Sequence, residues 1–326
     1  MSGARVVLVV NPWSGRGRAQ RAAPLISQRL HERGLNVEVV SGTSRQDADD
    51  RLQAALSTPT AAVVACGGDG TVNLVLQQLV RTSVALAVAP YGTGNDAAAA
   101  LHSPHDPVAV ADAVADGLAE PQAHSWAVDV GEIRTADGTV RYYLAVMSSG
   151  FDSSVNARAE AMRWPTGRAR YVAAVLADLR RFRPVPYSVV IDAGREQEQS
   201  FRRRGMLVAV GNTRSYGGGM QVCPAALPDD GHLHLTFVSE LSVPRFLSVF
   251  PQVFRGTHVR RPEVSTAVAT TVRLDAPDQT AYADGERIGP LPVEVRVVPG
   301  AVRVLVPPHE RPADGGGSGR GGKARG

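Results

Sequence analysis

Three glycine-rich stretches contain the residues of this sequence that are best suited to chemistry. They read "NPWSGRG" (11–17), "CGGDGTVN" (66–73) and "PYGTGND" (90–96). Each follows a short apolar run and precedes a segment with helical periodicity. Glycine lets backbone N–H groups approach a phosphate closely, and a following helix directs its positive end at the anion. One such stretch would be weak evidence, but three in equivalent positions predict a polyphosphate site.

Acidic and amide side chains within these stretches add candidate ligands. Asp69 lies inside the second stretch, where a lone carboxylate would repel phosphate. The repulsion becomes attraction if Mg²⁺ bridges carboxylate and phosphate oxygens, so we expect Asp69 to bind the metal that accompanies a nucleotide. Asp96 either caps the next helix or takes part in binding. Asn11 and Asn73 hold loop backbone, contact the ligand, or do both.

The elements that would position these residues alternate regularly over 5–102. The expected strands are 5–10, 36–40, 61–65 and 84–89, and the expected helices are 17–33, 45–57, 72–81, 95–102 and 105–118. Apolar strands separated by helices are typical of a parallel, doubly wound α/β sheet. Ligands of such sheets bind at the carboxyl ends of the strands, where all three glycine-rich stretches would lie.

A change of pattern near residue 124 predicts a second, mostly antiparallel β domain. The expected strands are 127–133, 142–149, 187–192, 205–211, 232–238 and 293–299, with helical insertions at 153–182 and 243–254. We therefore predict an α/β domain at 1–123 and a β-rich domain at 124–300. The last apolar run, about 301–308, could pair in either domain, and the Gly/Arg-rich segment 311–326 is predicted to be a disordered tail.

Composition excludes several classes of protein. The chain has 326 residues, 44% hydrophobic and 20% charged, which is typical of a globular protein. Of its formal charge of +4, a balance of +3 lies in the tail from Arg311 onward, so we expect no nucleic-acid partner. No apolar run is long enough for a membrane span, and two distant cysteines favour a reducing cytoplasm.

Lysine usage narrows the chemistry further. Lys323, in the tail, is the only lysine of the chain. This excludes the lysine-bearing P-loop, pyridoxal Schiff-base enzymes and the strand lysine of protein kinases. Phosphate binding would depend on arginines, backbone amides and a metal.

The three motifs together resemble the diacylglycerol kinase catalytic domain, in the soluble bacterial lipid-kinase branch related to sphingosine and ceramide kinases. The resemblance rests on "NPWSG", "GGDGTVN" and "GTGND" in this order. It continues through "GFD" (150–152), "YGGGMQVCPAALPDDGHLHL" (216–235) and "ADGERIGPLPVEVRVVPGAVRVLVP" (283–307), and so covers nearly all the chain except the tail. "GGDG" alone also occurs in NAD kinases and phosphofructokinases, so it implies only that type of fold.

The resemblance implies ATP-dependent phosphorylation of a lipid hydroxyl, most simply of diacylglycerol to phosphatidic acid. The nucleotide-binding residues that it implies are Asn11, Pro12, Trp13, Ser14, Gly15, Thr43, Gly67, Gly68, Asp69, Gly70, Thr71, Val72, Asn73, Thr93, Asn95 and Asp96. It implies a structural Mg²⁺ on Asp230, with carbonyls near Leu227 and His232 completing the site. It draws the general base from Asp284 or Glu286. A carboxylate that accepts the hydroxyl proton is also what phosphoryl transfer requires, although Asp284 and the glycine after it could simply form a hairpin turn.

Two departures from the family pattern keep alternatives open. Leu74 stands where the family usually has Glu, and Ala97 where it usually has Phe or Leu. A kinase of a sphingoid or soluble polyol acceptor, or a silent nucleotide- or lipid-binding regulator, therefore remain rivals. The sequence does not fix the oligomeric state, and a homodimer is among the options.

Two further clusters suggest partners. His232 and His234 share a strand face and could bind zinc, although no third or fourth ligand is evident nearby. The arginine-rich segment Arg158–Arg183 is either a solvated helix face or a lip that meets anionic lipid headgroups. The second option predicts a cytoplasmic protein in peripheral contact with the inner membrane face.

Overall fold

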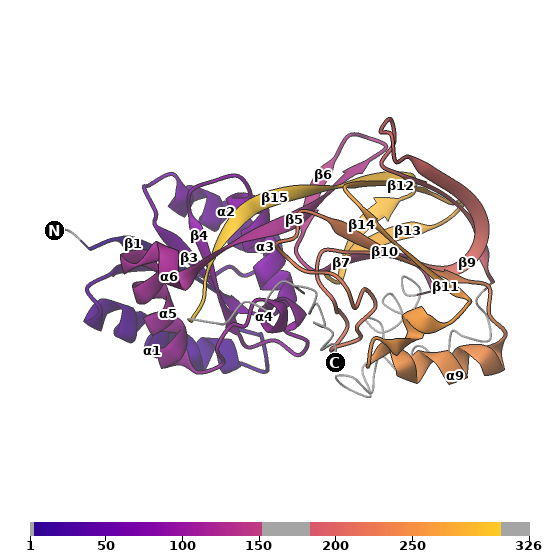
Figure 1. The fold of residues 1–326 in the computed structure, drawn as a ribbon. Coiled ribbons are helices and arrows are strands. Elements are labelled where there is room, and N and C mark those ends of the chain that lie inside the picture. The colour runs from indigo at the N-terminus through magenta and orange to yellow at the C-terminus, as the bar shows by residue number, and fades with distance from the viewer. Residues whose placement is uncertain (1–2, 152–182, 308–326) are drawn as a thin grey trace, which may run out of the picture.

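The computed structural model describes residues 3–151 and 183–307, and within them the strands form one continuous fifteen-stranded sheet (Figure 1). The N-terminal half contains β1 (Arg5–Val10), α1 (Arg18–Glu32), β2 (Asn36–Val40), α2 (Arg45–Leu56), β3 (Ala62–Gly67), α3 (Asp69–Leu79), β4 (Ala85–Pro90), α4 (Asp96–Ala100), α5 (Pro107–Ala119) and α6 (Pro121–His124).

The strands of this half are parallel, in the order β2-β1-β3-β4. Strands β1, β3 and β4 are almost entirely buried, whereas β2 at the edge is mostly exposed, and successive side chains point to opposite faces of the sheet. Val7, Val63 and Leu86 pack with α2 and α3 on one face, whereas Leu8 and Val64 pack with α1 and α5 on the other. Helices thus cover both faces, as the predicted doubly wound sheet requires.

The second half is built mainly from antiparallel strands. It contains β5 (Ser125–Thr135), β6 (Val140–Tyr143), β7 (Val146–Gly150), β8 (Val185–Ile191), β9 (Gln199–Gly211), β10 (Leu233–Ser239), α9 (Val243–Val253), the 3₁₀ helix η1 (Thr257–Arg260), β11 (Val264–Ala269), β12 (Thr271–Asp275), β13 (Thr280–Ala283), β14 (Glu286–Pro290) and β15 (Val293–Leu305). The predicted fold class, an α/β unit followed by a mostly antiparallel β unit, is confirmed.

A long ribbon made of β5 and β15 runs through both halves (Figure 1). The two strands pair antiparallel from Val293 opposite Thr135 to Leu305 opposite Ser125, with one shift of register between Val298 and Val302. The last part of β15 also pairs parallel with β4. The two halves therefore share strands as well as a chain connection.

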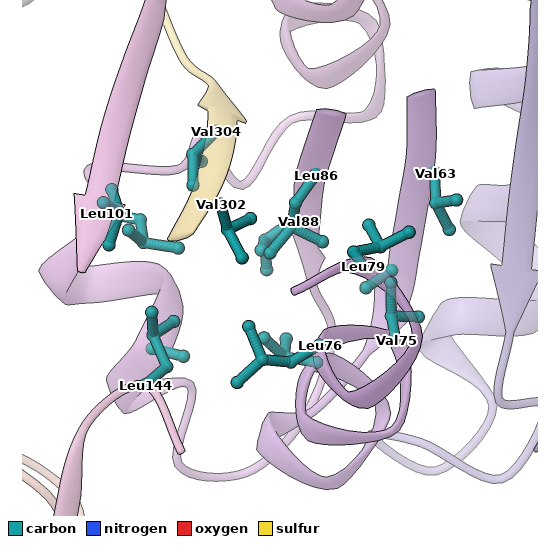
Figure 2. Close-up of a cluster of buried hydrophobic side chains, with 14 of the residues drawn as sticks. Val63, Val75, Leu76, Leu79, Leu86, Val88, Leu101, Leu144, Val302 and Val304 are labelled. Atoms are coloured by element: carbon teal, nitrogen blue, oxygen red, sulfur yellow. The ribbon is translucent and has the colours of Figure 1, made fainter. Parts of the chain in front are cut away.

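Side chains from both halves share one hydrophobic cluster. Figure 2 shows Leu144, which lies between β6 and β7, beside Leu76 of α3, with Val302 and Val304 of β15 facing the same space. Leu144 and Leu76 are fully buried. The peptide at Leu144 is consequently anchored against the helix that follows the second glycine-rich stretch.

Several elements differ from the prediction, and β11, β12, β13 and β14 were not among the expected strands. Helix α3 begins at Asp69 rather than at residue 72, because Gly68 is the extended N-cap and the final glycine of the run is already helical. The expected strand 142–149 is two strands, β6 and β7, separated at Leu144 and Ala145. Helix α4 has only five residues. The expected insertion 153–182 lies outside the described residues.

Candidate active site

The three glycine-rich stretches lie against one another at the carboxyl ends of β1, β3 and β4. A Cβ atom on Gly92 would overlap the Cα atom of Gly68, and one on Gly15 would overlap the carbonyl oxygen of Tyr91. Gly15 also has a φ of +59°, a conformation that favours glycine. The close approach of the loops therefore depends on glycine at these positions.

Hydrogen bonds fix the three loops relative to one another. Arg18 donates from Nη2 to Gly92 O (2.8 Å) and from Nε to Gly15 O (3.2 Å). Asn11 N donates to Cys66 O (3.1 Å), and the side-chain oxygen of Asn95 accepts from Gly92 N (2.8 Å). The loops thus form one cross-linked rim, with the N-terminal end of α3 at its centre.

Asp69 lies in the first turn of α3 and is enclosed by the third loop. Its Oδ2 accepts a hydrogen bond from Asn95 N (2.8 Å), and its Oδ1 accepts one from Ala97 N (3.1 Å). Burial raises the pKa of Asp69, and the negative charge of Asp96 raises it further. Clustered carboxylates of this kind are relieved by a divalent cation, and their oxygens are the ligands that Mg²⁺ prefers. Asp69 and Asp96 could therefore supply two oxygen ligands to Mg²⁺, but residues 3–151 and 183–307 contain no group of three or more such side chains that could hold a metal.

Asp96 connects the third loop to the second half of the chain. Its two carboxylate oxygens accept hydrogen bonds from Gly218 N (2.9 and 3.1 Å), and Oδ1 also accepts one from Gly219 N (3.0 Å). Both glycines have positive φ, which turns their N–H groups toward the carboxylate. The N-cap residue of α4 is Asn95, so the alternative role of Asp96 as a cap is wrong.

Asp284 reaches the same region from the turn between β13 and β14. Its Oδ2 accepts from Leu144 N (2.7 Å) and its Oδ1 from Ala145 N (2.8 Å), while Asn73 Nδ2 lies 3.4 Å from Oδ2. Burial raises the pKa of Asp284 to about 6, with the charge of Asp69 as a further contribution, although the hydrogen bonds from Leu144 and Ala145 oppose the shift. The structure therefore brings Asp284 into electrostatic contact with Asp69.

The turn at Asp284 has the conformation that its sequence suggests. Asp284 and Gly285 both have positive φ, of 50° and 82°, as a two-residue hairpin turn requires. The turn and the site are thus compatible: the backbone makes the hairpin while the carboxylate points at Asn73. Glu286, the first residue of β14, lies instead at an exposed edge, where its Oε1 pairs with Arg45 Nη1 at 2.7 Å.

Two residues of this region were missed by the sequence analysis. Arg45 begins α2 and contacts Glu286, Asn73 and Gly70. Asn212, at the end of β9, is fully buried, and its Nδ2 donates to Asp129 O and Leu144 O, both at 2.8 Å. The only signal in the sequence for Asn212 was an amide that ends an apolar run, five residues before the glycines at 217–219, whereas nothing local marks Arg45.

Asn212 fixes the segment that holds Asp284. Besides the bond from its side chain to Leu144 O, its backbone N donates to Ala145 O (2.8 Å). With both carbonyls engaged on one side, the N–H groups of Leu144 and Ala145 are directed at the Asp284 carboxylate. Asn212 therefore positions the two donors that lower the pKa of Asp284.

The remaining predicted nucleotide contacts vary in accessibility. Trp13 is 66% exposed, Thr93 is exposed, and the N and Oγ1 of Thr43 both donate to Asp47 Oδ2 (2.7 and 3.0 Å). Val72 packs in the hydrophobic core, so only its backbone could meet a ligand. Pro12, Ser14, Gly67 and Thr71 lie in or beside the rim, with the Ser14 hydroxyl next to Gly68 and that of Thr71 next to Gly67.

Both departures from the family pattern are buried. Leu74 packs with the core cluster between α3 and the sheet, where an apolar side chain is favoured. Ala97 is also buried, and its backbone N–H donates to Asp69. Leu74 is thus a core residue, and Ala97 contributes to the site through its main chain.

At the predicted structural metal site, the carboxylate of Asp230 is hydrogen-bonded to two histidines. Asp230 Oδ1 accepts from His232 N (2.9 Å), and Asp230 Oδ2 pairs with His234 Nε2 (2.9 Å). Leu227 is partly buried in the same loop. In residues 3–151 and 183–307, no group of three or more His, Cys, Asp or Glu side chains could hold a metal. Zinc on His232 and His234 therefore gains no further side-chain ligand there, and Mg²⁺ would depend on Asp230 and backbone carbonyls.

Several other predictions can be placed. Cys66 and Cys223 are buried free thiols, and burial raises the pKa of each to about 12. Among the helices that the structure describes, none has the length and apolar character needed to cross a bilayer. The segment Arg158–Arg183 lies outside the described residues except for its last position.

Two family models match the chain. The diacylglycerol kinase catalytic domain matches residues 5–126, and the YegS C-terminal NAD kinase beta sandwich-like domain matches residues 145–306. The chain is 42% identical over 306 residues to the diacylglycerol kinase of Mycobacterium tuberculosis strain H37Rv, which covers 94% of this chain and 96% of that protein. It is 25% identical over 307 residues to the diacylglycerol kinase of Staphylococcus epidermidis strain RP62A, over 93% and 92% of the two chains.

Solved structures show the same fold. One from Bacillus anthracis superposes with a TM-score of 0.73 at 20% identity, over 94% of this chain and 99% of that chain. Another, of a diacylglycerol kinase from the same organism, superposes with a TM-score of 0.68 at 18% identity. Because the identities are so low, these two likenesses establish the fold alone.

Proposed function

This chain belongs to the diacylglycerol kinase family and is a lipid kinase, and from that premise we propose that it transfers the γ-phosphate of ATP to the hydroxyl of diacylglycerol. The observation that carries the proposal is the contact between Asn73 and Asp284. It joins the helix that begins at Asp69 to a carboxylate more than two hundred residues later. This contact supports a single site for the metal–nucleotide and the acceptor, as phosphoryl transfer requires.

The glycine rim would bind the phosphates of ATP. Its loops present backbone N–H groups and the positive end of α3, which together favour an anion. Asp69 would hold the Mg²⁺ of the nucleotide, since it lies in the first turn of α3 and close enough to Asp96 for the two negative charges to interact. When bound, Mg²⁺ supplies charge neutralisation for the phosphate oxygens.

Asp284 is the better candidate for the general base. Its pKa of about 6 leaves it mostly ionised at neutral pH, yet close enough to neutrality to accept a proton efficiently. In the transfer, the acceptor oxygen bonds to the γ-phosphorus as the bond from that phosphorus to the ADP oxygen breaks. The hydroxyl proton passes to the Asp284 carboxylate. Glu286 is less suited to this role, because its side chain is 38% exposed at the edge of the sheet, whereas Asp284 contacts Asn73 of α3.

Diacylglycerol is the acceptor favoured by the relatives, since those reported above are named diacylglycerol kinases. The test is transfer of labelled phosphate from ATP to a panel containing diacylglycerol, ceramide, sphingosine and glycerol in mixed micelles. We expect Mg²⁺-dependent labelling of diacylglycerol. Labelling of a sphingoid base alone would identify that base as the acceptor in place of diacylglycerol. Labelling of none of the panel would favour a binding protein without activity.

We also propose a structural Mg²⁺ on Asp230, with the carbonyl oxygens of Leu227 and His232. The carbonyl of Pro228 in the same loop is held by Asp129 N at 2.7 Å, which restrains the loop backbone. Thermal unfolding in Mg²⁺ and in chelator, for wild type and Asp230→Asn, would test this site. We expect Mg²⁺ to raise the Tm of the wild type only.

A further inference from the structure

Arg45 has an unusual set of partners at the junction of the two halves. Its Nη1 contacts Glu286 Oε1 (2.7 Å) and Gly70 O (3.4 Å), and its Nη2 donates to Asn73 Oδ1 (3.1 Å). Gly70 and Asn73 belong to the glycine-rich stretch that opens α3, and Glu286 follows the turn that carries Asp284. One guanidinium thus contacts both sides of the site.

The position of Arg45 relative to α3 follows from the geometry at Gly70. A Cβ atom on Gly70 would lie 3.2 Å from Glu286 Oε1 and 3.9 Å from Arg45 Nη1. The ion pair therefore lies directly over the first turn of the helix, where its backbone is bare. This is the end of the helix to which an anion is attracted.

The ion pair between Arg45 and Glu286 contributes little to the stability of the fold. The side chains of Arg45 and Glu286 are 48% and 38% exposed. Exposed ion pairs contribute about 0–1 kcal/mol, so the partners exchange readily for other ligands. A phosphate oxygen of higher charge would displace the single carboxylate of Glu286 from the guanidinium.

The acidic side chains of the site favour a side-chain cation beside the phosphates. Asp69, Asp96 and Asp284 are all acidic, and the only lysine, Lys323, lies in the tail outside the described residues. Arg18 also contacts the rim, but its guanidinium donates to the carbonyls of Gly15 and Gly92 and so cross-links the first and third loops. Arg45 differs because it faces a weakly held carboxylate.

We propose that Arg45 is the side-chain ligand of the terminal phosphates of the nucleotide, and that binding transfers its guanidinium from Glu286 to phosphate oxygens. The planar fork of arginine suits two phosphate oxygens at once, which lysine cannot match. This inference rests on the proposed use of ATP. It makes Arg45 a residue that discriminates nucleotides by the number of their phosphates.

The test compares AMP, ADP and ATP by isothermal titration calorimetry in Mg²⁺, without any lipid. For Arg45→Met, which keeps the length of the side chain but removes its charge, we expect ATP to bind roughly 10- to 100-fold more weakly. AMP should bind as it does to the wild type. Arg45→Lys should recover part of the loss, because it restores the charge without the fork.

Arg204→Met is the matched control. Arg204 lies on β9, and it is likewise an exposed arginine in an ion pair, with Glu240. It should leave all three affinities unchanged. Equal losses for AMP and ATP in Arg45→Met, or no loss at all, would overturn the inference. The calorimetric measurement needs no acceptor, so it tests the role of Arg45 even if no lipid is phosphorylated. Failure of the proposed function would instead appear as wild-type protein that binds ATP but labels no lipid.

Discussion

Asn73 Nδ2 lies 3.4 Å from Asp284 Oδ2, so an amide on α3 contacts a carboxylate from the turn between β13 and β14. The other end of the same amide, Oδ1, accepts a hydrogen bond from Arg45. Asn73 therefore links the cation proposed for the phosphates to the base proposed for the acceptor. This small network is the basis of the predictions that follow.

Replacing Asp284 with Asn should remove the proton acceptor while keeping the shape of the side chain. General base catalysis typically contributes about 10²- to 10⁴-fold, so we expect kcat to fall by roughly that factor. Affinity for ATP, measured by calorimetry, should change little. Asp275→Asn, at an exposed carboxylate of β12, is the control and should retain full activity. Wild-type turnover in Asp284→Asn would mean that the base lies elsewhere.

The rate should depend on pH through the same carboxylate. A base with a pKa of about 6 must be ionised to accept a proton, so kcat should rise about tenfold per pH unit below pH 6 and level off above it. The profile should be measured at saturating substrates between pH 4.5 and 8.5. A plateau that extends unchanged down to pH 4.5 would contradict the assignment.

The raised pKa also predicts how stability varies with pH. Between about pH 4 and 6, folded Asp284 binds more protons than its unfolded counterpart, whose pKa is 3.8. Its contribution to the free energy of unfolding is therefore present at low pH and is lost as the pH rises through 6. Urea denaturation of wild type and Asp284→Asn across this range should show the variant gaining relative stability with pH. A constant difference would show that the shift is absent.

Asn212 should act on catalysis without touching a substrate. In Asn212→Leu, the carbonyls of Leu144 and Asp129 lose their partner, and the two N–H groups that lower the pKa of Asp284 lose their alignment. We expect the rising limb of the pH–rate profile to move to higher pH and kcat to fall. Asn212→Asp keeps the size of the side chain but also loses the donor, because a carboxylate only accepts hydrogen bonds, so it should shift the profile in the same direction. An unshifted profile, with stability alone reduced, would indicate a purely structural residue.

The carboxylate of Asp96 should hold the glycine loop of the second half. Hydrogen bonds to a charged group contribute about 1.5–3 kcal/mol, so Asp96→Ala should lower the free energy of unfolding by an amount of that order. Hydrogen exchange at Gly218 and Gly219 should accelerate. Asp116→Ala, which removes an exposed partner of Arg33, should affect neither loop glycine. Unchanged exchange in Asp96→Ala would show that other contacts order the loop.

Local patterns were sufficient to predict the parallel sheet and the rim. The strands at 5–10 and 36–40 coincide with β1 and β2, because short valine-rich runs between helices favour strands, although only β1 is a continuous apolar run. The glycine-rich stretches fall at strand ends for the same reason. The start of α3 was misplaced, since the glycines suggested a loop where the helix had already begun.

The contacts that organise the site could not be predicted from local patterns. Arg45 and Glu286 are 241 positions apart, and neither has a neighbour in sequence that indicates the pairing. The break of the strand at Leu144 likewise depends on Asn212, which lies 68 positions later. Such pairings follow from how the two halves meet, and the sequence pattern alone does not determine that geometry.

The ribbon of β5 and β15 limits how the two halves can move. Because its hydrogen bonds continue from the α/β sheet into the β unit, a rotation of one half about the other must bend paired strands. The ribbon is least regular between Val298 and Val302, where the Asp129 carboxylate accepts from Gly300 N at 2.7 Å. A ligand that contacts both halves would therefore meet a junction whose relative orientation is set by paired strands.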